Sequence, residues 1–251
     1  MAVSTEQQLQ ERISELESEL AVRVREAALK ERQLERYAAD LRETFKEERA
    51  RAQELRQSYM LTVRALASAV EARDAYTGRH AERVAAYGLQ LASVYGMRLG
   101  DNPEIEFGFL LHDAGKVAVP DAILLKPGSL TSAERQIIEQ HPITGSEIVR
   151  DIAFLGAARD VIRHHHERWD GTGYPDRLAG DDIPISARIF AVADTLDALT
   201  TNRPYRRAST IAQARVIILQ AGGTHFDPDV IEAFKLLTDA EIDRIRLEIG
   251  G

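Results

Sequence analysis

The first 60 residues contain neither proline nor glycine, and their apolar residues recur at helical spacing. These apolar residues are Leu9, Ile13, Leu16, Leu20, Val24, Ala27, Leu34, Tyr37, Leu41, Phe45, Ala52, Leu55 and Tyr59. Most steps between them are three, four or seven residues, which places them on one narrow stripe of an α-helix. A helix of about 60 residues would be about 90 Å long at ~1.5 Å per residue, much longer than a small domain needs.

So thin an apolar stripe cannot be buried by folding back on its own chain. Pairing with a second copy would bury it, so we predict a parallel coiled coil and a homodimer. The alternative is a solvated helix that packs loosely on its own domain. Arg23 and Glu48 fall on the stripe and leave its register open. We predict a signalling helix over residues 1–61, controlled by an upstream sensor or partner protein, and a second domain over 62–251.

From residue 62 onward the sequence predicts helices separated by short breaks, and alternating strand patterns are scarce. Asn102-Pro103 is typical of a helix start, and Thr131 to Glu134 forms a capping-box pattern. The other helices are expected over 62–95, 152–166, 187–200, 211–221 and 229–237. We therefore predict an all-α fold.

Composition excludes several classes of protein. Hydrophobic residues make up 44% of the chain, enough for a packed core, and the formal net charge of −8 argues against a nucleic-acid binder. No apolar run approaches the roughly 18 residues that a membrane span needs. The N-terminus lacks the apolar segment of a signal peptide, so we expect a cytoplasmic protein with no membrane partner.

Cysteine is absent, so any transition metal must be held by imidazole and carboxylate groups. The histidines fall in suggestive places. His112 and Asp113 are adjacent after an apolar run, residues 164–166 are a histidine triplet, and Asp194 lies inside an apolar run. His80 and His141 are isolated.

Each of these features also has an ordinary explanation. A single histidine is usually a surface or core residue, and a histidine triplet can be a polar linker. Asp194 is harder to explain in this way, because an unpaired carboxylate among apolar side chains is costly to bury. A metal ion would remove that cost. Together the features supply imidazoles and carboxylates from several helices, which is how metal sites are built in helical cores.

The order of these motifs resembles the HD-GYP family, a branch of the HD superfamily of metal-dependent phosphohydrolases. The resemblance runs from about Val63 to Phe234. Its blocks are the segments 77–80 (TGRH), 112–116 (HDAGK), 120–128 (PDAILLKPG), 141–142 (HP), 165–175 (HHERWDGTGYP), 193–200 (ADTLDALT), 203–206 (RPYR) and 223–227 (GTHFD).

The resemblance implies a helical HD-type domain over 62–251 that hydrolyses cyclic di-GMP with Fe or Mn ions. By match to the family motif, the implied metal ligands are His80, His112, Asp113, His141, His165, His166 and Asp194. His164 has no counterpart in the motif. Some family members hold a third ion with a glutamate four residues before the first histidine. Here that residue is Tyr76, a poor ligand with a normal pKa near 10, so we predict two ions.

Two divalent ions about 3.5–4 Å apart can activate water and neutralise charge on a phosphodiester. We expect Asp113 to bridge the ions and Lys116 to bind the scissile phosphate or the leaving oxygen. Arg203 and Arg206 would bind the second phosphate, although they could also be solvent-facing. Tyr174 would stack on a guanine or support the histidines. Asp197 is expected only to brace its helix.

The predicted function is therefore hydrolysis of cyclic di-GMP to linear pGpG and, if the reaction continues, to GMP. One alternative is a regulatory module that binds metal with little turnover. Another is a hydrolase of a different nucleotide, such as a hybrid cyclic dinucleotide.

Overall fold

The computed structural model describes residues 4–73, 79–98, 104–202 and 207–250, and the chain divides into two compact units, residues 1–58 and 59–251. The described residues form α- and 3₁₀-helices, and the one β pairing among them is an isolated bridge between Gly222 and Phe226. The predicted all-α class is confirmed. The domain limits predicted from sequence, 1–61 and 62–251, remain a prediction.

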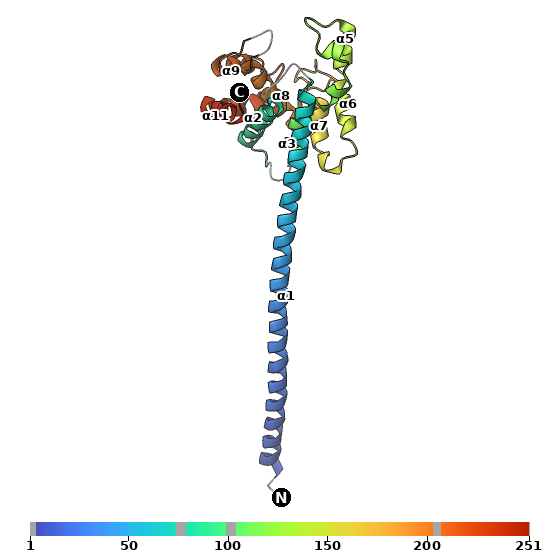
Figure 1. The fold of residues 1–251 in the computed structure, drawn as a ribbon. Helices are drawn as coiled ribbons and strands as arrows, with labels where there is room; N and C mark the ends of the chain where they lie inside the picture. Colours follow the sequence, from blue (N-terminus) through green and yellow to red (C-terminus); the bar gives the residue numbers. More distant parts are fainter. Residues whose placement is uncertain (1–3, 74–78, 99–103, 203–206, 251) are drawn as a thin grey trace. The chain divides into compact units, whose positions relative to one another are not determined.

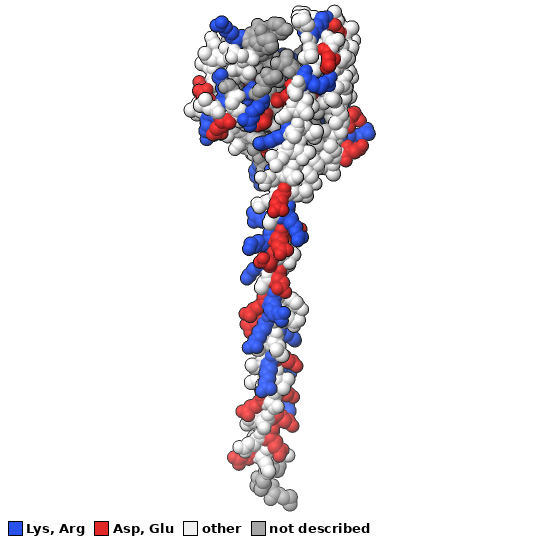
Figure 2. Space-filling view, viewed as in Figure 1, with Lys and Arg blue, Asp and Glu red and all other residues white. Residues whose placement is uncertain are grey.

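The first unit consists of a single helix, α1 (Ser4–Glu71), which continues into the second unit. The predicted long N-terminal helix is therefore confirmed. Its apolar stripe is exposed: Leu20 is 62% accessible, Leu34 66% and Phe45 69%. Figure 2 shows charged residues of both signs along this unit. Pairing through the stripe remains a prediction.

The second unit contains the helices that follow along the chain (Figure 1). They are α2 (His80–Tyr95), α3 (Glu104–Leu111), η2 (Ala114–Ala118), α4 (Asp121–Leu124), α5 (Ser132–Ile138), α6 (His141–Ile148), η3 (Ala153–Leu155), α7 (Ala158–His164), η4 (Gly180–Asp182), α8 (Ile185–Thr200), α9 (Ile211–Gln220), α10 (Pro228–Leu236) and α11 (Asp239–Ile249).

Two expected helices are interrupted. The helix predicted over 62–95 is wrong, because α1 ends at Glu71 and α2 starts at His80. Arg79 has a φ of 60°, a left-handed conformation that a right-handed helix cannot contain. The helix predicted over 152–166 is split into η3 and α7, and the backbone N–H of Ala157 donates to the Glu104 carboxylate at 2.8 Å. Asn102 and Pro103 lie outside the described residues.

Capping boxes begin three of the helices. Thr131 and Glu134 form the predicted one at α5, while Thr210 opens α9 and Thr238 opens α11 in the same manner. Helix α11 was not among the predicted helices, although Thr238 and the glutamate three residues later carry the same signal. The capping-box pattern predicts the N-terminus of a helix from sequence alone, because its two partners are only three residues apart.

The core brings helix ends to one place. Helix α2 packs on α8, α3 on α7, and α6 on η2. The buried rings of Phe109 and Phe190 lie 5.4 Å apart between α3 and α8. Phe190 also contacts two histidines, with ring centroids 4.7 Å from His112 and 5.7 Å from His165. An apolar floor therefore lies under the polar groups described next.

Candidate metal centre

Helix ends supply most of the side chains of the candidate site. His80 and His141 are the first residues of α2 and α6, whereas His112 follows α3 directly. Asp113 comes next in the chain, and His165 and His166 follow α7. Asp194 alone comes from the middle of a helix, α8. Because these elements meet over Phe190, all seven implied ligands lie in one region.

The side chains form two groups. One contains His80, His112 and Asp194, and the other contains His141, His165 and His166; within each group the potential ligand atoms lie within 4.8 Å of one another. In the first group, His80 Nε2 is 3.4 Å from Asp194 Oδ1. Each group therefore provides three nitrogen or oxygen donors that could bind one metal ion.

Asp113 connects the two groups. Its Oδ2 atom is 3.1 Å from His112 Nε2, and its Oδ1 atom is 3.3 Å from His141 Nε2. Burial would raise the pKa of Asp113, but the charge of Lys116 and the contacts with His112 and His141 hold it well below its usual value. Asp113 is therefore an anion that offers one oxygen to each group.

The hydrogen bonds of the histidines fit a bound cation. Three of them direct Nδ1 at a backbone carbonyl oxygen three residues earlier in the chain. The distance is 2.9 Å from His112 to Phe109, 2.7 Å from His141 to Ile138, and 2.9 Å from His165 to Ile162. A carbonyl can only accept, so Nδ1 donates in all three rings and Nε2 is left as the atom that can bind a cation. The Nε2 atoms of His141 and His165 lie 3.1 Å apart. With both rings in the neutral Nδ1–H form, two lone pairs would face each other there, and a cation between them would remove their repulsion.

The pKa values of His165 and His166 also fit a bound cation. Burial, with repulsion from the neighbouring histidines, holds the pKa of His165 well below its usual value. Burial and the proximity of His141 lower the pKa of His166 to about 3. Both rings are neutral at physiological pH, the state that a metal ligand requires. Imidazole with carboxylate is a donor set that suits a divalent transition metal.

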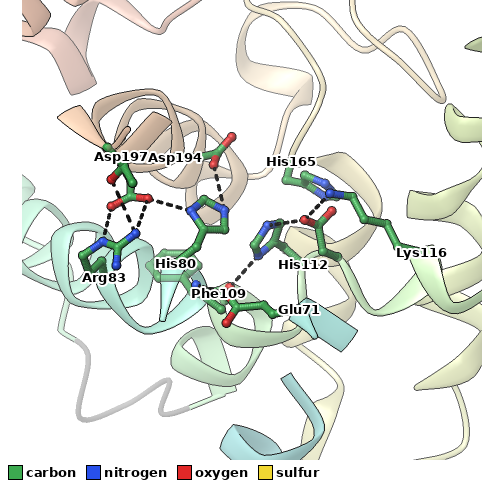
Figure 3. Close-up of polar contacts among 12 residues, drawn as sticks. Glu71, His80, Arg83, Phe109, His112, Lys116, His165, Asp194 and Asp197 are labelled. Carbon is green, nitrogen blue, oxygen red and sulfur yellow. Dashed lines mark hydrogen bonds and ion pairs between the residues drawn. The ribbon is translucent and has the colours of Figure 1, made fainter. Parts of the chain in front are cut away.

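Asp197 orients His80, a role that the sequence analysis missed. Asp197 is fully buried, and its carboxylate accepts from His80 Nδ1 at 2.7 Å and from Arg83 Nε at 2.6 Å (Figure 3). Burial lowers the pKa of His80, but the bond to Asp197 and the charge of Asp194 raise it to about 9, so a cation bound at its Nε2 would displace a proton from the ring. The ring is held with Nε2 toward Asp194, as outer carboxylates commonly hold metal-binding histidines.

Helix α8 buries a different carboxylate from the one predicted. Asp194 was expected to be the buried carboxylate of α8, yet its side chain is 29% exposed, and Asp197 is the buried one. The two lie almost one turn apart on the same helix face, which the sequence cannot rank by depth. We predicted no role in the metal site for Asp197. Its position between apolar residues, in the segment Leu196–Leu199, was nevertheless a signal that its carboxylate is buried.

Replacing Asp197 by asparagine should weaken Mn²⁺ binding roughly 10–100-fold, since outer-sphere partners of metal-bound histidines commonly contribute this much. Asparagine keeps the size of the side chain but removes the charge opposite Arg83. The measurement is a competition titration against a metal-binding dye. Asp239→Asn is the control, because Asp239 is 53% exposed and pairs with Arg215 away from the site. Equal affinities for Asp197→Asn and wild type would contradict this role.

Other predicted residues are placed as follows. Lys116 Nζ lies 2.8 Å from Asp113 Oδ2, so the lysine reaches the centre. The Tyr174 ring stacks on His166 with centroids 4.7 Å apart, which fits the supporting role, while stacking on a guanine remains a prediction.

His164 points toward Asp176, and its Nε2 atom lies 3.1 Å from the Asp176 carboxylate. Tyr76, Arg203 and Arg206 lie outside the described residues.

One side of the centre is accessible to solvent. Four of the five implied histidine ligands, His80, His112, His141 and His165, are buried at 8% exposed or less. The side chains of Asp113, Lys116 and Asp194 are 19%, 22% and 29% exposed. Because the carboxylates and the lysine form the accessible side, a ligand would approach from there.

Comparison with known proteins identifies the family. The profile described as HD domain matches residues 64–230, more than half of the chain. The chain therefore belongs to the HD domain family, and the resemblance to its HD-GYP branch is confirmed. The pair that gives the family its name is here His112 with Asp113.

Curated relatives agree with this assignment, and a solved structure shares the fold. A 3′3′-cGAMP-specific phosphodiesterase of Vibrio cholerae is 44% identical over 77% of this chain and 35% of its own length. A cyclic di-GMP phosphodiesterase of Thermotoga maritima is 42% identical over 71% of this chain and 49% of its own. The structure of a cyclic GMP-AMP specific phosphodiesterase of Vibrio cholerae has a TM-score of 0.56 at 18% identity and covers 76% of this chain and 53% of that one.

The chain thus spans less than half of the length of either curated relative. Within the part of the chain that the structure describes, no helix is both long and apolar enough to cross a membrane.

Proposed function

We propose that this chain is a metal-dependent phosphodiesterase that opens cyclic di-GMP to linear pGpG and, if hydrolysis continues, to GMP. The observation that carries the proposal is the shared carboxylate: the two oxygens of Asp113 face separate histidine groups, 3.1 Å from His112 and 3.3 Å from His141. This arrangement suits two divalent cations, Fe or Mn, held by the seven residues that the family motif implies.

The bound ions would supply activation of water and neutralisation of charge on the phosphate. The protein would hold them through neutral imidazoles and through Asp113 and Asp194. Lys116 would place its ammonium group on the scissile phosphate or on the leaving oxygen, because its Nζ already lies 2.8 Å from Asp113. Charge neutralisation is the central need, since anionic oxygens repel a nucleophile.

The remaining substrate contacts are proposed from the family motif. Arg203 and Arg206 would bind the second phosphate through bidentate hydrogen bonds. Tyr174 would hold His166 in place and present its free edge to the base. We further propose that the protein acts in the cytoplasm under control of an upstream sensor or partner protein.

A second candidate substrate is 3′3′-cGAMP, since the relative that is 44% identical is named as specific for it. The test is turnover of cyclic di-GMP, 3′3′-cGAMP and a linear dinucleotide by one metal-loaded preparation, compared as kcat/KM. A higher value for cyclic di-GMP supports the proposal, and a higher value for 3′3′-cGAMP replaces it with the second candidate. Binding of a cyclic dinucleotide without turnover would instead identify a regulatory module.

We also propose a homodimer formed by the apolar stripe of α1. Replacing Leu34 and Leu41 by glutamate should convert the dimer to a monomer of about 28 kDa, because like charges would face each other along the seam. Light scattering after gel filtration measures the mass. Glutamates at Val22 and Leu29 are the matched control: Leu29 is 66% exposed, as is Leu34, but lies off the stripe. Equal masses for the two double variants would refute this interface.

A further inference from the structure

The C-terminal end of α1 and the residues just after it contact two of the chain segments that carry residues of the metal centre, η2 and the start of α2. Arg73, just beyond the helix, points its guanidinium at η2. Nη1 donates to the carbonyl oxygens of Val117 at 2.6 Å and Lys116 at 3.4 Å, and Nη2 donates to the carbonyl of Val119 at 3.2 Å. Nη2 also pairs with Asp121 Oδ1 at 2.8 Å. One side chain thus binds the end of the turn that follows Asp113 and the residues just beyond it.

Glu71, the last residue of α1, makes the second contact. Its Oε1 accepts the backbone N–H of Ala81, the residue after His80 in the first turn of α2. The residue at the N-cap position, Arg79, provides no side-chain cap, so Glu71 supplies an acceptor that the helix end lacks locally. Glu71 also lines a small cavity together with Ala81, His112 and Asp113.

These contacts matter because the centre depends on the position of two short segments. Turn η2 determines where Asp113 and Lys116 stand, and the first turn of α2 determines where His80 stands. A displacement of about 1 Å can cost on the order of 10²-fold in rate when reacting groups lose their alignment. The carbonyls of a short 3₁₀ turn have few partners within the turn itself. Arg73 binds two carbonyls of η2, those of Lys116 and Val117, and the carbonyl of Val119 just after it, so it restrains the end of the turn.

We propose that Glu71 and Arg73 are positioning residues for the metal centre. Arg73 holds Asp113 and Lys116 through η2, and Glu71 holds His80 through the start of α2. The effect on turnover rests on the proposed function, whereas the effects on metal affinity and on backbone protection do not. Glu71 at the end of α1 and Arg73 just beyond it therefore help to hold the metal-binding residues in position.

The first experiment replaces Arg73 by alanine. We expect Mn²⁺ affinity to fall about 10-fold or more, as for other outer contacts of a metal site. We also expect faster amide exchange in residues 114–121, and a lower kcat with KM nearly unchanged. Guanidinium added to the solution should restore part of the rate. Arg150→Ala is the matched control, because Arg150 forms exposed ion pairs with Glu147 and Asp151.

The second experiment compares two changes at Glu71. Glu71→Gln keeps an acceptor oxygen for the Ala81 N–H and should behave like wild type, whereas Glu71→Ala should weaken metal binding and speed exchange at the start of α2. If Arg73→Ala does not fold, Arg73→Lys replaces it under the same criteria. Unchanged Mn²⁺ affinity and unchanged amide exchange in folded Arg73 and Glu71 variants would overturn the proposal. Altered metal affinity without any turnover by wild type would instead count against the proposed function alone.

Discussion

Replacing Asp113 by alanine should leave a folded protein that loses bound metal and hydrolyses cyclic di-GMP at least about 10³-fold more slowly than wild type. Among the residues that the structure describes, Asp113 is the one carboxylate that faces both histidine groups, so its loss removes a donor from each. The fold should survive because the side chain is 19% exposed and Lys116, left without this partner, is 22% exposed and can be hydrated.

Elemental analysis of the purified variant measures the metal, and a thermal melt verifies the fold. Asp151→Ala is the control, because the Asp151 side chain is 90% exposed and pairs only with Arg150 in the described contacts. An Asp113→Ala protein that keeps the metal content of wild type would show that this carboxylate is no ligand. Loss of metal with unchanged turnover would contradict the metal-dependent reaction.

Replacing Gly115 by alanine should have the second large effect. A Cβ atom at this position would lie 1.9 Å from the carbonyl oxygen of His141 and 2.6 Å from the backbone nitrogen of Gly145. Backbone atoms cannot yield as a flexible side chain can, so η2 and α6 must separate. That movement would carry Asp113 away from His141. We expect a loss of stability of about 1–3 kcal/mol, the usual range for overpacking, and a fall in activity of about 100-fold.

The measurements are urea unfolding, Mn²⁺ affinity and kcat/KM. Gly156→Ala is the matched control: its new Cβ would meet no described atom nearer than 3.6 Å, and its backbone is already helical. We expect this control to match wild type in all three quantities. A Gly115→Ala protein with wild-type stability and metal affinity would mean that η2 and α6 need not approach so closely.

The sequence predicted features whose cause is local in the chain. The capping box at Thr131 is such a feature, because its two partners are three residues apart. The long helix was predictable from the absence of proline and glycine and from the spacing of apolar residues. The break before His80 was not, because the signal is the left-handed backbone of Arg79, and arginine has no special preference for that conformation.

The ligand set came from the family motif rather than from physical reasoning. Spacing alone could not bring His80 to Asp194, since they lie on different helices. Burial alone selected Asp194, although Asp197 is the carboxylate that α8 buries. The contacts of Glu71 and Arg73 are also invisible in the sequence, because they depend on how α1 packs against α2 and η2. Long-range packing therefore determines the part of the site that the sequence does not predict.

The most direct test of the account follows the products formed from cyclic di-GMP by wild-type protein loaded with Mn or Fe. Chromatography should show linear pGpG accumulating, and a chelator that strips the ions should stop its formation. Readdition of the metal should restore it. A preparation that carries two ions per chain and forms no product from cyclic di-GMP would contradict the central claim.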